Sequence, residues 1–310
     1  MGKKLNVVFY RHDTPIFDGV QHNFFHQAIW LALPELLGNA TRVELDCSFV
    51  DVNVDDGFYF DPIEGDFDIA YSDKCVPRRK PAKFYFAVQS DWRGEEERIK
   101  KWMRLAHPDA LLNMYSPAQS LIDACEELDI RYEYQPWFIV NKQPFPVDRP
   151  ITALCTGAMG THYVWRTEIA IQLHRMNRPD IISKEKMQTS YDEYLSLLGR
   201  TKYYCTGGTD DDIPEIASIP HKYFEACNYG CCLVSPDMPY MERAGFIDGE
   251  TYIKLNSVEE LSGILVSDRW KEIGRAGQQM VQRMHTVKAR ANKIIDLYLD
   301  NEIVKVCKEI

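Results

Sequence analysis

Short apolar runs alternate along the chain with longer segments in which apolar residues recur every three or four positions. Runs of the first kind predict buried strands, and segments of the second kind predict helices that cover a sheet. In the first half the pattern predicts strands at Leu5–Tyr10, Phe67–Tyr71 and Lys83–Val88 and helices at Gln21–Leu37, Glu95–Leu105 and Pro117–Leu128. In the second half it predicts strands at Ile151–Cys155, Lys202–Cys205, Cys231–Ser235 and Thr251–Leu255 and helices at Tyr163–Met176, Tyr191–Leu198, His221–Tyr229, Glu259–Leu265 and Trp270–Leu299. Such alternation is typical of an α/β protein with mostly parallel sheets.

A proline-rich segment divides this pattern into two halves. Asn141–Pro150 contains three prolines, which is typical of a linker. We therefore expect two Rossmann-like domains facing each other across a cleft, residues 1–145 and residues 146–310, with the last helix able to pack back on the first domain. Ligands of open parallel sheets bind beyond the carboxyl ends of the strands, so we expect the site in the cleft.

The composition indicates a globular protein with no general preference for polyanions. Of the 310 residues, 45% are hydrophobic and 26% are charged, and the formal net charge is −10. A negative net charge does not favour DNA or anionic membranes as partners. No apolar run is long enough to span a bilayer, and the N-terminus has no signal-peptide pattern. The nine cysteines form no C-x-x-C pair, so we expect reduced thiols in a cytoplasmic protein.

Residues 43–73 contain ten acidic residues and no basic ones. We interpret this segment as a solvated loop with weak strand content. Its acidic residues lack the regular ligand spacing of a calcium loop, so no metal site is expected there.

The segment Thr156–Arg166 (TGAMGTHYVWR) links a predicted strand to a predicted helix. Gly157 and Gly160 would let backbone N–H groups approach an anion, and the helix N-terminus adds partial positive charge. Arg166 could pair with a phosphate. The alternative is an ordinary tight turn.

The segment 221–237 (HKYFEACNYGCCLVSPD) places charged residues on a helix that leads into an apolar strand. Lys222 and Glu225 are three residues apart, so they share a face of the helix that begins at His221. A Lys fits a phosphate, and a carboxylate fits a pair of ribose hydroxyls. The alternative is a salt bridge at the rim, which contributes little. We favour binding, because the strand that follows brings this helix against the core.

The order of these motifs resembles the donor half of GT-B glycosyltransferases. After the glycine loop and Arg166 come K-x-x-E-A-x-x-x-G-C-x-L-V-S-P, then GETYIKLNSVEEL and GRAGQQMVQRMHTVKAR. Over about residues 150–295 the chain looks most like the CgeB-like branch, which is related to the group 1 transferases. The resemblance implies a nucleotide-sugar donor, with a UDP-sugar first among donors whose base stays open. It implies a donor site formed by Thr156, Gly157, Gly160, Arg166, His221, Lys222 and Glu225.

One position departs from the family pattern. Group 1 transferases usually carry a second Glu eight residues before the ribose-binding Glu, and here Ala217 stands there. Two alternatives therefore stay open, a catalytically silent nucleotide-sugar-binding or scaffold protein and a GT-B nucleotide-sugar epimerase. The main hypothesis is metal-independent transfer of a hexose or pentose to a hydroxyl of a glycan, a small molecule or a modified nucleic-acid base.

The resemblance assigns the acceptor to the first half of the chain, where two predicted loops leave strands at their carboxyl ends. Asp91 is the first choice for the base that deprotonates the acceptor, because Trp92 beside it could stack on a sugar or base. Asp13 is the second choice, with His12 as a further option. Either aspartate could instead cap a helix. The candidate acceptor-binding residues are Arg11, Asp18, Trp92, Arg78 and Arg79.

The last two of these belong to a basic segment, Asp73–Lys83 (DKCVPRRKPAK). It could attract an anionic acceptor, with DNA as one candidate. The alternative, which we favour, is a solvated loop that balances the acidic segment before it.

Overall fold

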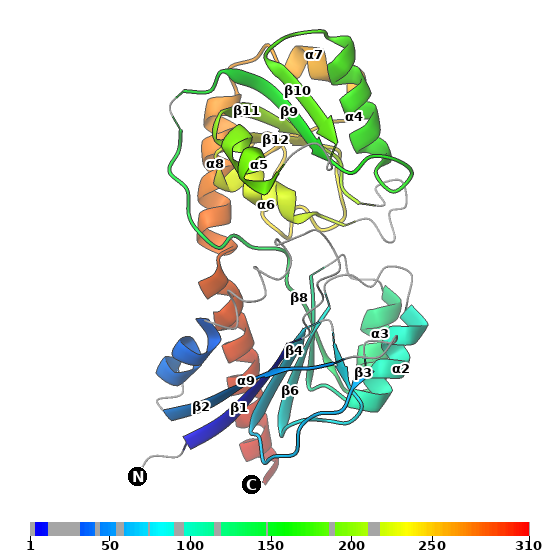
Figure 1. Ribbon diagram of the computed structural model, residues 1–310, viewed down its shortest axis with the longest axis vertical. Coiled ribbons are helices and arrows are strands. Elements are labelled where there is room, and N and C mark those ends of the chain that lie inside the picture. The colour runs from blue at the N-terminus through cyan, green and yellow to red at the C-terminus, as the bar shows by residue number, and fades with distance from the viewer. Residues whose placement is uncertain are drawn as a thin grey trace. The chain divides into compact units, whose positions relative to one another are not determined.

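The computed structural model describes residues 4–11, 32–40, 44–53, 59–73, 75–89, 96–114, 119–146, 148–185, 190–209 and 218–309 (Figure 1). The chain divides into two compact units. One is Met1–Gln135 together with Val287–Ile310, and the other is Pro136–Thr286. The first unit thus ends before the expected boundary at residue 145, and it includes the last helix.

A six-stranded parallel sheet forms the centre of the first unit. Its strands are β1 (Lys4–Arg11), β2 (Glu44–Asp51), β4 (Ile69–Asp73), β6 (Phe84–Gln89), β7 (Ala110–Asn113) and β8 (Arg131–Tyr134). They lie in the order β2-β1-β4-β6-β7-β8, and β3 (Tyr59–Phe60) pairs with β5 (Val76–Pro77) in a separate small sheet. The strand order reverses between β1 and β4, which marks the topological switch point of this sheet.

Alternate residues of this sheet face two layers of helices, as the period of two along a strand requires. On one face Val8, Tyr85 and Leu111 share a buried cluster with residues of α2 (Glu96–Ala106) and α3 (Gln119–Glu127). The other face is covered by the helical residues 32–40 and by α9 (Val287–Glu309).

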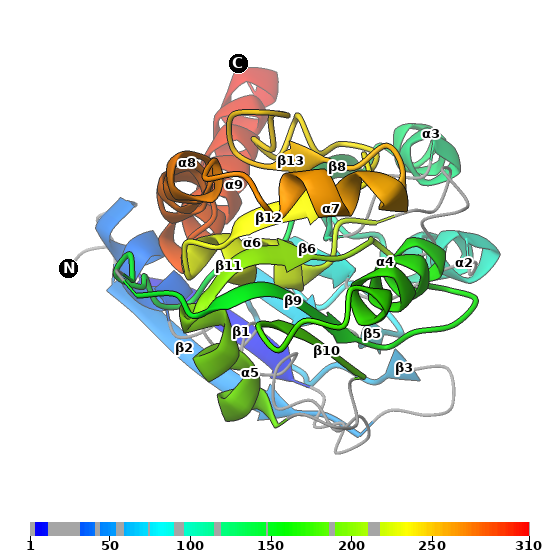
Figure 2. The ribbon, with the colours of Figure 1, turned by 90° about the horizontal axis from the view of Figure 1, so that it is seen from above.

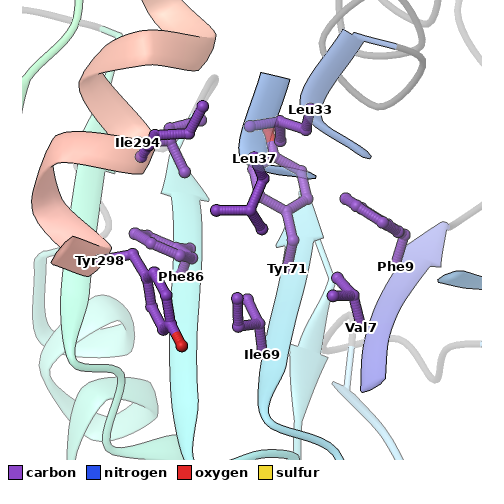
Figure 3. A pocket seen from close by; sticks show the side chains of 10 residues that line it. Val7, Phe9, Leu33, Leu37, Ile69, Tyr71, Phe86, Ile294 and Tyr298 are labelled. Atoms are coloured by element: carbon purple, nitrogen blue, oxygen red, sulfur yellow. The ribbon is translucent and has the colours of Figure 1, made fainter. Parts of the chain in front are cut away.

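An apolar cavity of about 20 Å³ lies between the sheet and the two helical segments on this face, residues 32–40 and α9. Figure 3 shows Leu33, Leu37, Ile294 and Tyr298 over strand residues that include Phe9, Tyr71 and Phe86. Two ion pairs also hold α9 to β8, Arg131 with Asp300 at 3.2 Å and Lys293 with Glu133 at 3.3 Å. These contacts explain why α9 belongs to the first unit.

The second unit contains a five-stranded parallel sheet in the order β10-β9-β11-β12-β13 (Figure 2). The strands are β9 (Ile151–Gly157), β10 (Ile181–Glu185), β11 (Thr201–Cys205), β12 (Cys232–Ser235) and β13 (Ile253–Lys254). The helical elements are α4 (Val164–Arg175), α5 (Tyr191–Gly199), α6 (His221–Asn228), η2 (Val258–Glu260), α7 (Leu261–Ile264) and α8 (Trp270–Met284).

Neighbouring tyrosines of β11 show how the two faces of this sheet are covered. Tyr203 lies in a buried cluster with residues of α4, α7 and α8. Tyr204 points to the opposite face, where its ring meets Tyr194 of α5 at 6.4 Å in an edge-on arrangement. The helix α6 also lies on the Tyr204 face, since Tyr223 pairs with Ser235.

Three predictions from the sequence are wrong in detail. The segment 43–73, expected to be a solvated loop with weak strand content, contains a full edge strand, β2, in which acidic side chains alternate with partly buried Leu45 and Cys47. The long predicted helix Trp270–Leu299 is two helices. It breaks after Met284, where His285 receives the backbone N–H of Ile139 on its carbonyl and pairs through its ring with the Ala244 carbonyl at 2.8 Å.

The third correction concerns the proline-rich segment 141–150, which packs as part of the second unit instead of forming a linker. Asn228 binds it through its side chain, donating to the Asn141 carbonyl and accepting from the Gln143 N–H. Arg149 lies over the rings of Phe145 and Trp270. Proline content indicated a break in regular structure, but these contacts fix the segment.

Candidate functional site

The strand order of the second unit reverses between β9 and β11, so their loops diverge at the carboxyl edge of the sheet. β9 is buried along its whole length and ends at Gly157, whose φ of 130° is rarely adopted by L-residues with a side chain. A Cβ at this position would lie 3.0 Å from both Arg166 Nη1 and Lys222 Nζ. Two cationic groups, one from α4 and one from α6, therefore converge on the same backbone position.

Arg166 joins the loops after β9 and β11. Its buried guanidinium lies over the Tyr163 ring, 4.4 Å from the centroid. It donates through Nε to Thr206 Oγ1 (3.0 Å), through Nη1 to the Ala158 carbonyl (3.0 Å), and through Nη2 to the carbonyls of Gly207 (3.0 Å) and Gly208 (3.3 Å). These bonds leave one N–H on Nη1, the nitrogen nearest Gly157. Within the described residues no carboxylate forms an ion pair with Arg166, so carbonyl groups, the Thr206 hydroxyl and the Tyr163 ring offset its charge.

Lys222 lies beside Arg166 and is oriented by two other elements. Its Nζ is 3.4 Å from the Thr156 carbonyl and 5.1 Å from the centroid of the Tyr194 ring. The hydroxyl of Tyr204 holds Thr156 in turn, at 3.1 Å from Oγ1 and 3.3 Å from the carbonyl oxygen. The ammonium group therefore has a defined position at the end of β9.

Glu225 lies one helical turn from Lys222 and is only 5% exposed. Its Oε1 accepts a hydrogen bond from the Tyr191 hydroxyl at 2.8 Å, and its Oε2 accepts one from the Tyr194 hydroxyl at 3.2 Å. His221 Nε2 is 3.4 Å from Oε2, and the His221 ring meets Trp137 edge-on at 5.6 Å. The carboxylate is thus enclosed by aromatic side chains and is not part of a salt bridge at the rim.

The enclosure changes the acidity of this carboxyl group. Burial raises the pKa of Glu225 to about 7, although the Tyr191 hydrogen bond, the Lys222 charge and the Tyr194 hydrogen bond each lower it. Burial also raises the pKa of Tyr191 and of Tyr194 above the ordinary tyrosine value, so both hydroxyls remain donors. Near neutral pH the charge of Glu225 responds to small changes in its surroundings.

In the loop between β9 and α4, the backbone N–H of Gly160 was expected to approach an anion, but it donates within the loop. Gly160 has a φ of 118°, but its N–H donates to Thr167 Oγ1 at 2.9 Å. Thr167 Oγ1 in turn donates to the Tyr163 carbonyl at 2.9 Å. The Gly160 N–H is therefore engaged within the loop, and Gly160 is exposed, away from the cations at Gly157.

The structure brings together six of the seven residues expected at the donor site: Thr156, Gly157, Arg166, His221, Lys222 and Glu225. The expected residues of the acceptor side are largely outside the described part of the chain. They are His12, Asp13, Asp18, Asp91 and Trp92, to which the side chain of Arg11 is added. Arg11 itself ends β1, beside the switch in strand order of the first unit.

Except for Lys74, the basic segment 73–83 is described, and three of its four described cations have acidic partners. Arg78 pairs with Asp61 at 3.9 Å, and Lys80 pairs with Asp109 at 2.8 Å. Lys83 pairs with Asp66 and Asp68. Arg79 donates to the Pro62 carbonyl at 3.4 Å. These contacts favour the interpretation of a solvated loop that balances the acidic segment.

Sequence reasoning missed the tyrosines of this site. Tyr191 and Tyr194 are three residues apart on α5, so they share a face. α5 starts where Ser190 accepts the N–H of Glu193, a capping pattern visible in the sequence. The paired tyrosines were a detectable signal, but their partner Glu225 lies on a different helix.

Two negative findings apply to the described ranges only. They contain no group of three His, Cys, Asp or Glu side chains that could hold a metal ion. Asp210–Asp212, the acidic run of the second half, lies outside them. No helix in the same ranges has an apolar stretch that would cross a bilayer.

Comparison with solved structures shows that the chain has the GT-B fold of glycosyltransferases, which contains two Rossmann-like units. Sucrose-phosphate synthase from Thermosynechococcus elongatus superimposes with a TM-score of 0.56 at 13% identity, covering 97% of this chain and 100% of the other. Anabaena HepE in complex with UDP-glucose gives 0.55 at 10% identity, covering 96% and 100%. TarM gives 0.52 at 10% identity, covering 74% of this chain and 54% of TarM. The chain thus spans about half the length of TarM.

The second half of the sequence also resembles a known family. Residues 154–296 match the family described as glycosyl transferase-like. This confirms the resemblance that the motif order suggested for residues 150–295, while the CgeB-like branch stays a prediction. A search of curated proteins gives no significant match.

Proposed function

We propose that the protein is a glycosyltransferase that takes a sugar from a nucleotide-sugar held by its second unit. The observation that carries this proposal is the convergence of Arg166 Nη1 and Lys222 Nζ at 3.0 Å from the Cβ position of Gly157. Two positive charges at a side-chain-free strand end fit a diphosphate. The family match and the GT-B fold support the same assignment. The UDP-glucose bound to HepE supports a UDP-sugar as the donor.

In this proposal Lys222 and the remaining Nη1 N–H of Arg166 bind the diphosphate. Thr156 and His221 line the site. Glu225 binds the ribose hydroxyls with the lone pairs that the tyrosines leave, since each carboxylate oxygen accepts two hydrogen bonds. Gly160 acts through the shape of its loop, because its N–H is already engaged.

The chemistry assigned to these groups is stabilisation of the leaving diphosphate. The bond between the anomeric carbon and the diphosphate oxygen breaks, and its electron pair stays on the diphosphate. The acceptor oxygen bonds to the anomeric carbon, and its proton passes to a base. Fixed cations near the diphosphate stabilise the charge that develops there. We therefore propose that transfer is metal-independent.

The acceptor side of the proposal rests on topology. β1 ends at the switch in the strand order of the first unit, and ligand sites of open parallel sheets lie at such switches. Asp91, with Asp13 and His12 as alternatives, is the proposed base. We place the reaction in the cytoplasm, because the cysteines of the described ranges are free thiols.

Calorimetry with UDP tests the donor site. Loss of one charge-assisted contact in Lys222→Ala should weaken UDP binding about 10- to 100-fold. Lys271→Ala is the matched control. Lys271 is exposed on the first turn of α8, a helix whose Gly274 lies against Gly230 just before β12, at the amino edge of the sheet. Equal UDP affinity in the wild type and both variants would refute the site.

A silent nucleotide-sugar-binding protein is the second candidate, because Ala217 stands where group 1 transferases carry a Glu. Incubation with UDP-glucose and water or a sugar acceptor separates the two candidates. A transferase releases UDP, and Lys222→Ala slows that release. Tight UDP binding without release of UDP from several UDP-sugars would favour the silent protein.

A further inference from the structure

One aromatic side chain contacts both charged groups that α6 brings to the donor site. Tyr194 is 4% exposed and lies on α5, and its side chain contacts two residues of α6. Its ring centroid is 5.1 Å from Lys222 Nζ, and its hydroxyl donates to Glu225 Oε2 at 3.2 Å. The ring face and the hydroxyl edge of a tyrosine act on different partners, so the two contacts are compatible.

A second tyrosine continues the same network to the end of β9. The ring of Tyr204 meets the ring of Tyr194 edge-on at 6.4 Å, and its hydroxyl pairs with Thr156. Lys222 donates to the carbonyl of the same Thr156 at 3.4 Å. The contacts therefore close a ring that runs through Lys222, Thr156, Tyr204 and Tyr194, and Glu225 is joined to it by the Tyr194 hydroxyl. A closed ring of buried contacts restricts the orientation of each member.

We infer that Tyr194 is a positioning residue of the donor site, which orients the Glu225 carboxylate through its hydroxyl and the Lys222 ammonium through its ring. This inference rests on the proposed function. Tyr194 touches neither the diphosphate nor the ribose in this assignment and acts through the two residues that do. Tyr191 shares the first task only, because its hydroxyl donates to Glu225 Oε1 at 2.8 Å.

Two substitutions of Tyr194 test the two contacts separately, because they remove different parts of its side chain. Tyr194→Phe removes the hydroxyl and keeps the ring next to Lys222. Tyr194→Leu removes both. Tyr194→Phe should therefore affect recognition of the ribose alone, whereas Tyr194→Leu should affect recognition of both the ribose and the diphosphate.

The probes are UDP, its 2′-deoxy analogue and inorganic pyrophosphate, each titrated by calorimetry at pH 7.5. In Tyr194→Phe the preference for UDP over the deoxy analogue should fall about fivefold, the value of one hydrogen bond. Pyrophosphate affinity should stay at the wild-type value. In Tyr194→Leu pyrophosphate affinity should also fall, by about threefold, because the cation–π contact with Lys222 is lost.

Tyr203→Phe is the control for general loss of a buried hydroxyl. Tyr203 is the neighbouring residue of β11, is fully buried and donates to the Ser267 carbonyl on the opposite face of the sheet. Its loss should lower stability without changing either preference. Equal losses of all three ligands in Tyr194→Phe and Tyr203→Phe would indicate a structural role only and overturn the inference.

A pH series provides a readout that a purely structural role would not move. The titratable groups around Glu225 are His221, Lys222 and Tyr229 on or next to α6, and Tyr191 and Tyr194 on α5. Without the Tyr194 hydroxyl the carboxylate loses a donor, so the pH at which preference for UDP over its deoxy analogue appears should rise. An unshifted profile contradicts the inference. If instead the wild type and Lys222→Ala bind UDP equally, the proposed function itself fails.

Discussion

Replacing Glu225 with glutamine should remove a pH-dependent loss of stability from the folded protein. The pKa of Glu225 is raised from 4.5 to about 7, because burial disfavours the charged carboxylate more than its partners favour it. Between these two pH values the folded chain holds a proton that the unfolded chain has released. The free energy of unfolding therefore falls as the pH rises through this interval and is insensitive to Glu225 above it.

The size of the effect follows from the same interval. A change of one pH unit corresponds to about 1.4 kcal/mol, so the full interval gives an upper limit of about 3 kcal/mol at pH 8. Glutamine has nearly the same shape and carries no charge, so the variant lacks this loss. Relative to the wild type, Glu225→Gln should be more stable at pH 8 than at pH 5 by up to that amount.

The assay is urea unfolding of the full chain at pH 5, 6, 7 and 8, with the wild type and the variant measured side by side. Glu272→Gln, at an exposed position on α8, is the control and should show a constant difference from the wild type. The reasoning is wrong if the difference between Glu225→Gln and the wild type is the same at pH 5 and pH 8.

Four further outcomes are expected. Gly274→Ala should destabilise the protein by about 1–3 kcal/mol despite better helix propensity, because its Cβ would lie 2.6 Å from the Gly230 carbonyl. Gly263→Ala, with open space around its Cβ position, should be neutral or stabilising, and thermal melts of both variants check these two outcomes. Gly157→Ala should cost about 1–3 kcal/mol through its φ of 130° and should weaken UDP binding in calorimetry, since the methyl group meets both cations. Sugar transfer should continue in EDTA at the untreated rate, and activity lost in EDTA and restored by manganese would contradict the proposal.

The local pattern of the chain predicted most of the elements that carry the site. The strands β1, β6, β9, β11 and β12 lie where short apolar runs placed them. The missed strands include three whose signal is weak locally. β8 (Arg131–Tyr134) is polar, β7 (Ala110–Asn113) is only four residues long, and β2 is acidic. Each is a strand because a neighbouring strand pairs with its backbone, which side-chain periodicity does not report.

The sequence by itself determined which residues could form the donor site. Gly157 at a strand end, Arg166 in the first turn of a helix, and Lys222 and Glu225 one turn apart all follow from periods of two and 3.6 residues. Those periods describe the faces of single elements.

Tertiary structure alone decided what these residues do with their hydrogen bonds. It directs two of the five Arg166 donors to backbone carbonyls of the loop after β11. It also encloses Glu225 with tyrosines 34 and 31 positions away in the chain. Desolvation and pairing depend on which elements meet in space, so the raised pKa of Glu225 and the role of Tyr194 arise only when α5 and α6 pack on the same face of the sheet.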